Sequence, residues 1–177
     1  MSDAIRVGLA GFGYASKTFH APLIGGTPGM ALKAVASSDA DKVHADWPGV
    51  KVMSAPGDLL DDPDIDLVVI ATPNDTHFPL AKAALEAGKH VVVDKPFTVT
   101  LSQARELESL AKHCGRILSV FHNRRWDSDF LTVSALINEG QLGEVCYFES
   151  HFDRFRPQVR QRWRAQAGPR SGIWYYL

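Results

Sequence analysis

Short apolar segments alternate with helical segments along most of this chain of 177 residues. The run Leu67–Ala71 (Leu-Val-Val-Ile-Ala) is apolar at every position, and Ile5–Ala10 is largely apolar. A strand that is apolar on both sides is buried on both faces, which is typical of parallel sheets covered by helices. The alternation therefore predicts an α/β fold with a doubly wound parallel sheet.

Apolar periodicity, capping residues and glycine stops set the expected boundaries of these elements. The expected strands span 5–10, 30–37, 51–53, 67–71, 90–94 and 117–121. The expected helices span 16–25, 39–47, 77–87, 101–114 and 127–138. The first helix is expected to be interrupted near Pro22, because proline lacks the N–H that a helix interior needs.

The pattern changes at Gly143. Glu144–Phe155 is rich in Val, Tyr and Phe and is followed by no helix, which predicts the first strand of a different, antiparallel element. We expect one domain over residues 1–122, then a linker helix and the start of an incomplete α+β domain over residues 123–177. A lone strand of this kind leaves apolar surface unpaired, so a homo-oligomer is also expected.

Composition excludes several classes of function. The net charge of −1 indicates no nucleic-acid partner, and the arginines of residues 151–177 are spaced too irregularly for one. The two cysteines have no CxxC partner, so no metal site or disulfide framework is indicated. No apolar run reaches the ~18 residues of a membrane helix, and the start lacks a secretory pattern, so a cytoplasmic protein is expected.

A glycine-rich turn, Gly11-Phe12-Gly13-Tyr14-Ala15-Ser16, joins the first strand to the first helix. Two glycines at this spacing let the backbone turn sharply and approach a ligand closely. The usual ligand is the pyrophosphate of a dinucleotide, which N–H groups at the helix N-terminus bind. The third glycine of that pattern is Ser16 here, and a turn of this form without a phosphate is the alternative.

Polar residues follow the other strands, and in a parallel sheet the carboxyl ends of the strands share one edge. These residues could therefore line one crevice for a dinucleotide. The candidates after the second, fourth, fifth and sixth strands are Ser37, Ser38, Thr72, Pro73, Asn74, His77, Asp94, Lys95, Pro96, Asn123 and Arg124.

Ser37 lies 26 positions after Gly11, where a dinucleotide fold usually has an acidic ribose-binding residue. Ser37 and Ser38 would not repel a 2′-phosphate, and Lys42 is near, which favours NADP over NAD. The alternative is that Asp39 turns in and selects NAD.

Lys95 stands at the end of a buried strand and before a proline, which keeps it extended. Partial burial and a nearby cationic nicotinamide would lower its pKa and allow proton exchange near neutrality. The alternatives are a lysine that only binds ligand, or one that pairs with Asp94.

Several motifs in the same order resemble the glucose–fructose oxidoreductase/inositol dehydrogenase (Gfo/Idh/MocA) family, closest to the branch with NADP-dependent scyllo-inositol dehydrogenase. The matching pieces are the glycine turn, Ala71-Thr72-Pro73-Asn74 with His77, Asp94-Lys95-Pro96, His122-Asn123-Arg124-Arg125-Trp126-Asp127 and Arg162-Trp163-Arg164. The resemblance implies a Rossmann fold, NADP or NAD, and hydride transfer to or from a polyol, inositol or sugar. It makes Lys95 the catalytic residue and places Trp163 and Arg164 near the nicotinamide.

The resemblance also implies a Gly-x-x-x-Asp-x-x-x-His segment whose Asp and His work with the lysine. Gly172 matches its start, Tyr176 stands at the Asp position, and the His position lies beyond Leu177. The alternative function is therefore a truncated, catalytically inactive nucleotide-binding module.

Overall fold

The structure is a computed structural model that describes residues 4–151, 153, 155, 157 and 158. Contacts between residues divide the chain into two compact units. The sheet and its helices belong to the first unit, which runs to Phe121, and the second unit begins at His122.

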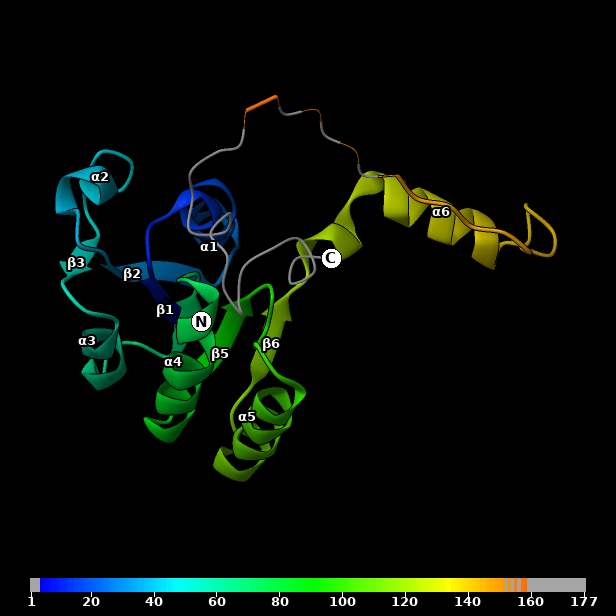
Figure 1. Cartoon of the computed structure of the whole chain (residues 1–177). Helices are drawn as coiled ribbons and strands as arrows, with labels where there is room; N and C mark the ends of the chain where they lie inside the picture. The colour runs from blue at the N-terminus through cyan, green and yellow to red at the C-terminus, as the bar shows by residue number, and fades with distance from the viewer. Residues whose placement is uncertain (1–3, 152, 154, 156, 159–177) are drawn as a thin grey trace. The chain divides into compact units, whose positions relative to one another are not determined.

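One six-stranded parallel sheet, in the order β3-β2-β1-β4-β5-β6, forms the centre of the first unit (Figure 1). Strand order reverses between β1 and β4, where open α/β sheets bind their ligands. The fold class expected from the sequence is therefore confirmed. The strands are β1 (Ile5–Ala10), β2 (Met30–Ala36), β3 (Lys51–Met53), β4 (Leu67–Ile70), β5 (His90–Asp94) and β6 (Leu118–Phe121).

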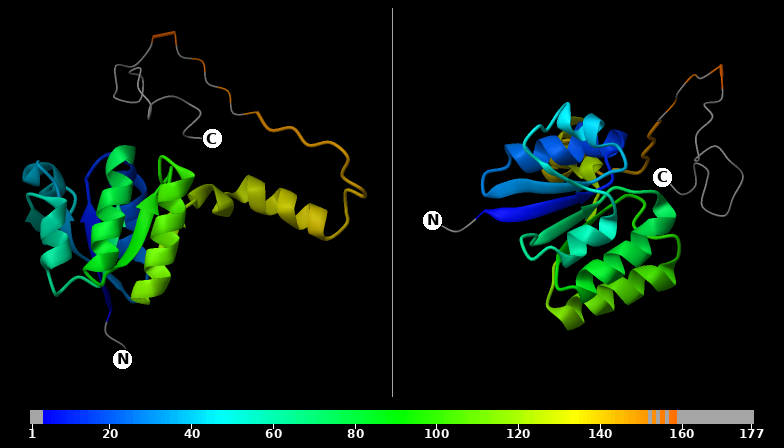
Figure 2. Two further views of the ribbon diagram at one scale, coloured as in Figure 1. Left: turned by 60° about the horizontal axis from the view of Figure 1, so that its bottom comes forward. Right: turned by 90° about the vertical axis from the view of Figure 1, so that its left-hand side faces the viewer.

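Helices cover both faces of the sheet, as the right-hand view of Figure 2 shows. Val7, Leu9 and Val35 are fully buried in one apolar cluster with residues of α1 and α2. Ile70 and Val93 are fully buried in the second apolar cluster, to which α3, α4 and α5 contribute residues. The helices are α1 (Ala21–Gly26), α2 (Ala40–His44), α3 (Pro56–Asp61), α4 (Asn74–Glu86) and α5 (Leu101–Cys114).

The carboxyl ends of the strands lie level with one another. Ala10, the last residue of β1, pairs with both Ala36 and Ile70, which end β2 and β4. Asp94 at the end of β5 pairs with Phe121 at the end of β6. The residues that follow these strands therefore share one edge of the sheet, as the sequence predicts.

The helix after the glycine turn begins as a π-helix, η1 (Ser16–His20), and continues directly as α1. The Ala21 N–H donates to the Ser16 carbonyl oxygen, five residues back instead of four. Pro22 follows at the start of α1, where its missing N–H is tolerated. The interruption expected near Pro22 is thus a change of helical register rather than a break.

The second unit contains a 3-10 turn, η2 (Asn123–Trp126), and α6 (Ser128–Asn138). The strand predicted over Glu144–Phe155 is wrong for the described residues, which have no strand there. A strand needs a neighbouring strand to pair with, and residues 144–151 have none in the described part. Tyr147 and Phe148 are exposed in this segment.

Candidate functional site

The glycine turn has the geometry of a close-approach turn. Gly11 has a φ of +89°, and a Cβ there would lie 3.0 Å from the Ala71 carbonyl oxygen. Gly13 is different, because no atom of the described residues would lie within 4 Å of a Cβ on that residue. The first glycine is thus required by the fold, whereas the second leaves open space that a ligand can enter.

A pocket of about 460 Å³ lies beside this turn and is lined from the ends of β1, β2 and β4. Phe12 is buried beneath the turn, whereas Tyr14 is 76 % exposed. Ser16 is fully buried, and its hydroxyl has no hydrogen-bond partner in the described part of the chain. The lining includes Gly11, Phe12, Gly13, Ser37, Ser38, Asp39, Lys42 and Thr72.

Asp39 faces this pocket as the N-cap of α2. Its Oδ1 accepts a hydrogen bond from the Lys42 N–H at 3.0 Å. Its backbone N–H donates to the Ser37 hydroxyl at 3.1 Å. One carboxylate oxygen of Asp39 is therefore bound to its own helix, while the Ser38 and Lys42 side chains are exposed at the pocket.

His77 joins the loops after β4 and β5. Its Nδ1 lies 2.8 Å from the Pro96 carbonyl oxygen and its Nε2 lies 2.9 Å from the Thr72 carbonyl oxygen. The side chain is 1 % exposed, in the first turn of α4. Buried in this way, His77 holds two loops of the site in place and is not a surface ligand group. Asn74 is also buried, whereas Pro73 is exposed.

Asp94 and Lys95 form the end of β5. The Lys95 N–H donates to Asp94 Oδ1 at 2.8 Å, and the Lys95–Pro96 peptide bond is cis. Burial raises the pKa of the Asp94 carboxyl, but the His20 imidazole, the Lys95 N–H and the His77 imidazole hold that pKa below its ordinary value of 3.8. The Lys95 side chain is exposed in the first unit, so the predicted partial burial is wrong there. The backbone N–H of Lys95 is held by its hydrogen bond to Asp94 Oδ1.

The remaining predicted residues do not belong to the described part of the first unit. Asn123 and Arg124 lie in the second unit, where Arg124 pairs with Asp127 at 2.7 Å. Trp163 and Arg164 lie outside the described residues.

Sequence reasoning missed three residues of the site. Ser54 lines the pocket from the segment after β3, and Pro56 lines it as the first residue of α3, a short helix that had not been expected. His20 is 3 % exposed, and its Nε2 lies 3.8 Å from Asp94 Oδ2. A histidine between the apolar residues Phe19 and Ala21 is the sequence signal that could have indicated a buried polar group.

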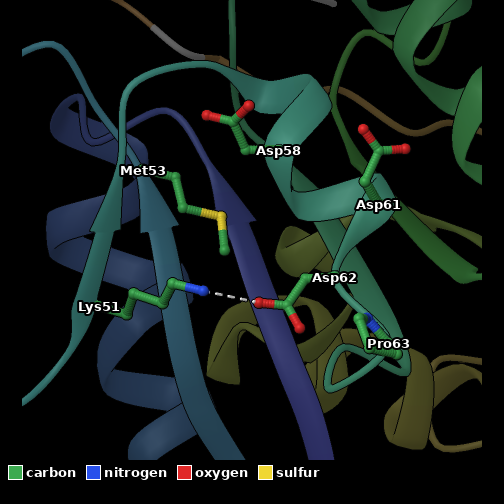
Figure 3. Close-up of a pocket in the computed structure, with 6 residues that line it drawn as sticks. All are labelled: Lys51, Met53, Asp58, Asp61, Asp62 and Pro63. Carbon is green, nitrogen blue, oxygen red and sulfur yellow. Dashed lines mark hydrogen bonds and ion pairs between the residues drawn. The ribbon is translucent and has the colours of Figure 1, made fainter.

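A second hollow, of about 510 Å³, lies beside β3 and α3 (Figure 3). Lys51 reaches Asp62 there at 3.0 Å, while Asp58 accepts the Ala55 N–H at the start of α3. Its acidic lining does not suit a pyrophosphate. Among the described residues, no cluster of His, Cys, Asp or Glu is arranged to hold a metal ion, and no helix is long and apolar enough to cross a membrane.

Two family models match the chain. Residues 5–122 match the Gfo/Idh/MocA oxidoreductase family, NAD-binding Rossmann fold, and residues 134–177 match the C-terminal alpha/beta domain of the same family. The first match contains the sheet, the glycine turn and the ends of all six strands.

Individual relatives agree with this assignment. The chain is 77% identical to the uncharacterized oxidoreductase YdgJ of Escherichia coli over 177 residues, covering 100% of this chain and 51% of that protein. It is 38% identical to the scyllo-inositol 2-dehydrogenase (NADP(+)) IolW of Bacillus subtilis over 175 residues, covering 99% and 49%. A solved oxidoreductase structure from Bacillus cereus superposes with a TM-score of 0.87 at 33% identity, covering 98% and 50%.

The chain thus spans about half the length of the curated relatives it matches. The glycine turn, the pocket and the lysine at the end of β5 all fall inside the matched Rossmann region. On the strength of that match, the chain belongs to the Gfo/Idh/MocA family of NAD(P)-binding oxidoreductases.

Proposed function

We propose that this chain is the cofactor-binding part of an NADP(H)-dependent oxidoreductase of polyols, inositols or sugars. The observation that carries the proposal is the pocket at the ends of β1, β2 and β4, on the sheet edge where Lys95 directly follows β5. The name of the Bacillus subtilis relative, an NADP(+)-dependent scyllo-inositol 2-dehydrogenase, supports the substrate class.

The described residues fit a dinucleotide. A Cβ on Gly13 would fill open space at the turn, and the pocket continues from there to Ser37, Ser38 and Lys42. Backbone N–H groups at such a turn bind phosphate oxygens, and the glycines allow that close approach.

NADP is the cofactor we propose over NAD. A 2′-phosphate gains from hydroxyl and ammonium donors and loses from a nearby free carboxylate. Ser38 and Lys42 are exposed donors at the pocket, and Asp39 is partly bound as the cap of α2. We expect Lys42→Ala to weaken NADPH binding by about 10-fold and to leave NADH binding unchanged. Ser38→Asp should reverse the preference. Equal affinities for the two cofactors in the wild type would refute this choice.

Lys95 is the proposed proton-transfer group. Bound nicotinamide supplies the hydride acceptor or donor. As an alcohol is oxidised, the Lys95 amine takes the hydroxyl proton, and in the reverse direction the Lys95 ammonium returns it. The hydrogen bond from the Lys95 N–H to Asp94 holds the start of this side chain.

The test combines cofactor binding with turnover of a polyol and sugar panel, followed by the absorbance of reduced nicotinamide. Lys95→Ala should lower kcat by about 10²–10⁴-fold and keep NADPH binding. Lys112→Ala is the control, because Lys112 is exposed on α5 and pairs only with Glu108 among the described residues. Absence of NADPH and NADH binding in the wild type would refute the proposal.

A second candidate is a nucleotide-binding module without turnover. Tyr176, at the position where the family resemblance implies an Asp, favours it. NADPH binding with no reaction on any member of the panel would select this candidate.

Other parts of the proposal stay predictions. They are the domains at 1–122 and 123–177, the roles of Asn123, Arg124, Trp163 and Arg164, a homo-oligomer and a cytoplasmic location. The family matches over residues 5–122 and 134–177 support the division into domains.

A further inference from the structure

His20 is a buried titratable residue that the proposed reaction does not use. It is 3 % exposed, and its Nε2 has no partner within hydrogen-bond distance among the described residues. Buried polar atoms are nearly always hydrogen-bonded, because an unpaired one loses its bonds to water and gains none in return. An unpaired imidazole nitrogen next to the binding edge therefore needs an explanation.

A carboxylate of the proposed catalytic motif lies near this nitrogen. His20 Nε2 lies 3.8 Å from Asp94 Oδ2, and the Asp94 side chain is 14 % exposed. The other oxygen of this carboxylate, Oδ1, accepts the Lys95 N–H at 2.8 Å. One carboxylate therefore stands between the imidazole and the backbone of Lys95.

The fold holds His20 in this position by two features. The π-type bond from the Ala21 N–H to the Ser16 carbonyl oxygen shifts the helical register just where His20 occurs, and π-turns inside helices are frequent at functional sites. The His20 ring also packs on Phe121 at the end of β6, with ring centroids 4.2 Å apart. His20 therefore contacts both β5 and β6 from the helix that follows the glycine turn.

We propose that His20 is a positioning residue that fixes the Asp94 carboxylate and, through it, the backbone of Lys95. The role of Lys95 rests on the function proposed above, whereas the contact between His20 and Asp94 does not. An imidazole N–H beside a carboxylate that is mostly buried stabilises the charged form and the orientation of that carboxylate. In this arrangement the side chains of His20 and Asp94 connect the helix after the glycine turn to the turn that carries Lys95.

Two titratable side chains and one backbone N–H act on Asp94. The side chains are His20 from η1 and His77 from α4, and the N–H is that of Lys95. His77 already has carbonyl oxygens at both ring nitrogens. His20 is thus the group among them whose ring nitrogen has no other described partner.

The experiment measures the titration of the Asp94 carboxyl by carbon NMR in the full chain without cofactor. His20→Phe keeps a ring against Phe121 and removes the N–H, whereas His20→Gln keeps an N–H donor. We expect the Asp94 midpoint to rise in His20→Phe and to return toward the wild-type value in His20→Gln. The backbone amide signal of Lys95 should shift in His20→Phe. In the Asp94→Asn variant, adding His20→Phe should leave the backbone amide signal of Lys95 unchanged.

The outcomes separate this proposal from the proposed function. Equal Asp94 midpoints in the wild type and in folded His20→Phe would overturn the role of His20, whether or not NADPH binds. If His20→Phe does not fold, His20→Gln and His20→Ala are compared instead. A wild-type Asp94 midpoint in His20→Gln with a raised Asp94 midpoint in His20→Ala supports the role of His20. Equal Asp94 midpoints in these two variants overturn it. Where the wild type turns over a polyol, His20→Phe should lower kcat about 10-fold or more with an unchanged KM for NADPH.

Discussion

The two glycines of the turn should respond differently to the same substitution. In Gly11→Ala the new methyl group lies 3.0 Å from the Ala71 carbonyl oxygen, and the residue has a φ of +89°. In Gly13→Ala the methyl group meets no described atom within 4 Å. The first change therefore acts on folding and the second on the ligand.

The magnitudes follow from these contacts. A left-handed backbone costs an alanine about 1–2 kcal/mol, and the tight contact adds about 1–2 kcal/mol. For a chain of this size a loss of about 2–4 kcal/mol lowers Tm by about 5–15 °C. Gly13→Ala should change stability by less than about 0.5 kcal/mol.

The binding result should be the reverse of the stability result. A methyl group on Gly13 occupies the space that the phosphates would need, so Gly13→Ala should weaken NADPH binding by about 10-fold or more. Calorimetry gives Tm, and NADPH fluorescence titration gives Kd. Gly26→Ala is the control, because its Cβ would also meet no atom within 4 Å and Gly26 lies outside the pocket. Wild-type NADPH affinity in Gly13→Ala would refute the proposed position of the phosphates, and equal Tm values for the two turn variants would refute the strain argument.

Two further predictions concern residues that stabilise the fold without lining the pocket. Hydrogen bonds from Arg6 lower the pKa of Asp66 from 3.8 to about 2. Because this carboxylate is 37 % exposed, solvent screening reduces the contribution of the shift to the free energy of unfolding to about 1 kcal/mol. Because that pKa is lowered by folding, Asp66→Asn should be less stable than wild type above about pH 4, and urea titrations should show the difference vanishing as pH falls through about 2. Asp64→Asn, at a carboxylate that is 81 % exposed, should show little difference at any pH. His77→Leu removes the imidazole that lies between two part-buried carbonyl oxygens and should cost about 2–4 kcal/mol in the same titrations. A stability within about 0.5 kcal/mol of wild type would contradict the bridging role.

The sheet could be predicted because its strands carry a strong local signal. A segment such as Leu67–Ile70 is apolar on both sides, and no other common element has that pattern at this length. The expected strand over Glu144–Phe155 failed because β structure depends on a partner that local sequence does not supply. The six-residue helix α3 was missed because it is too short to show a helical period.

The site was predicted as far as it depends on the ends of strands. Gly11, Ser37 and Thr72 line one pocket because the parallel register brings strand ends together. The contact of His20 with Asp94 could not be predicted, because it joins residues 74 positions apart through a π-turn that the sequence does not signal.

Main-chain atoms supply much of what joins the loops at the binding edge. His77 contacts the carbonyl oxygens of Thr72 and Pro96, and Asp94 accepts the N–H of Lys95. Every amino acid has a carbonyl oxygen, so the side chain at position 72 can be replaced while the contact to His77 remains. Proteins that share this fold can therefore change their ligand preference by exchanging side chains at this edge, while the main-chain contacts that join the loops remain.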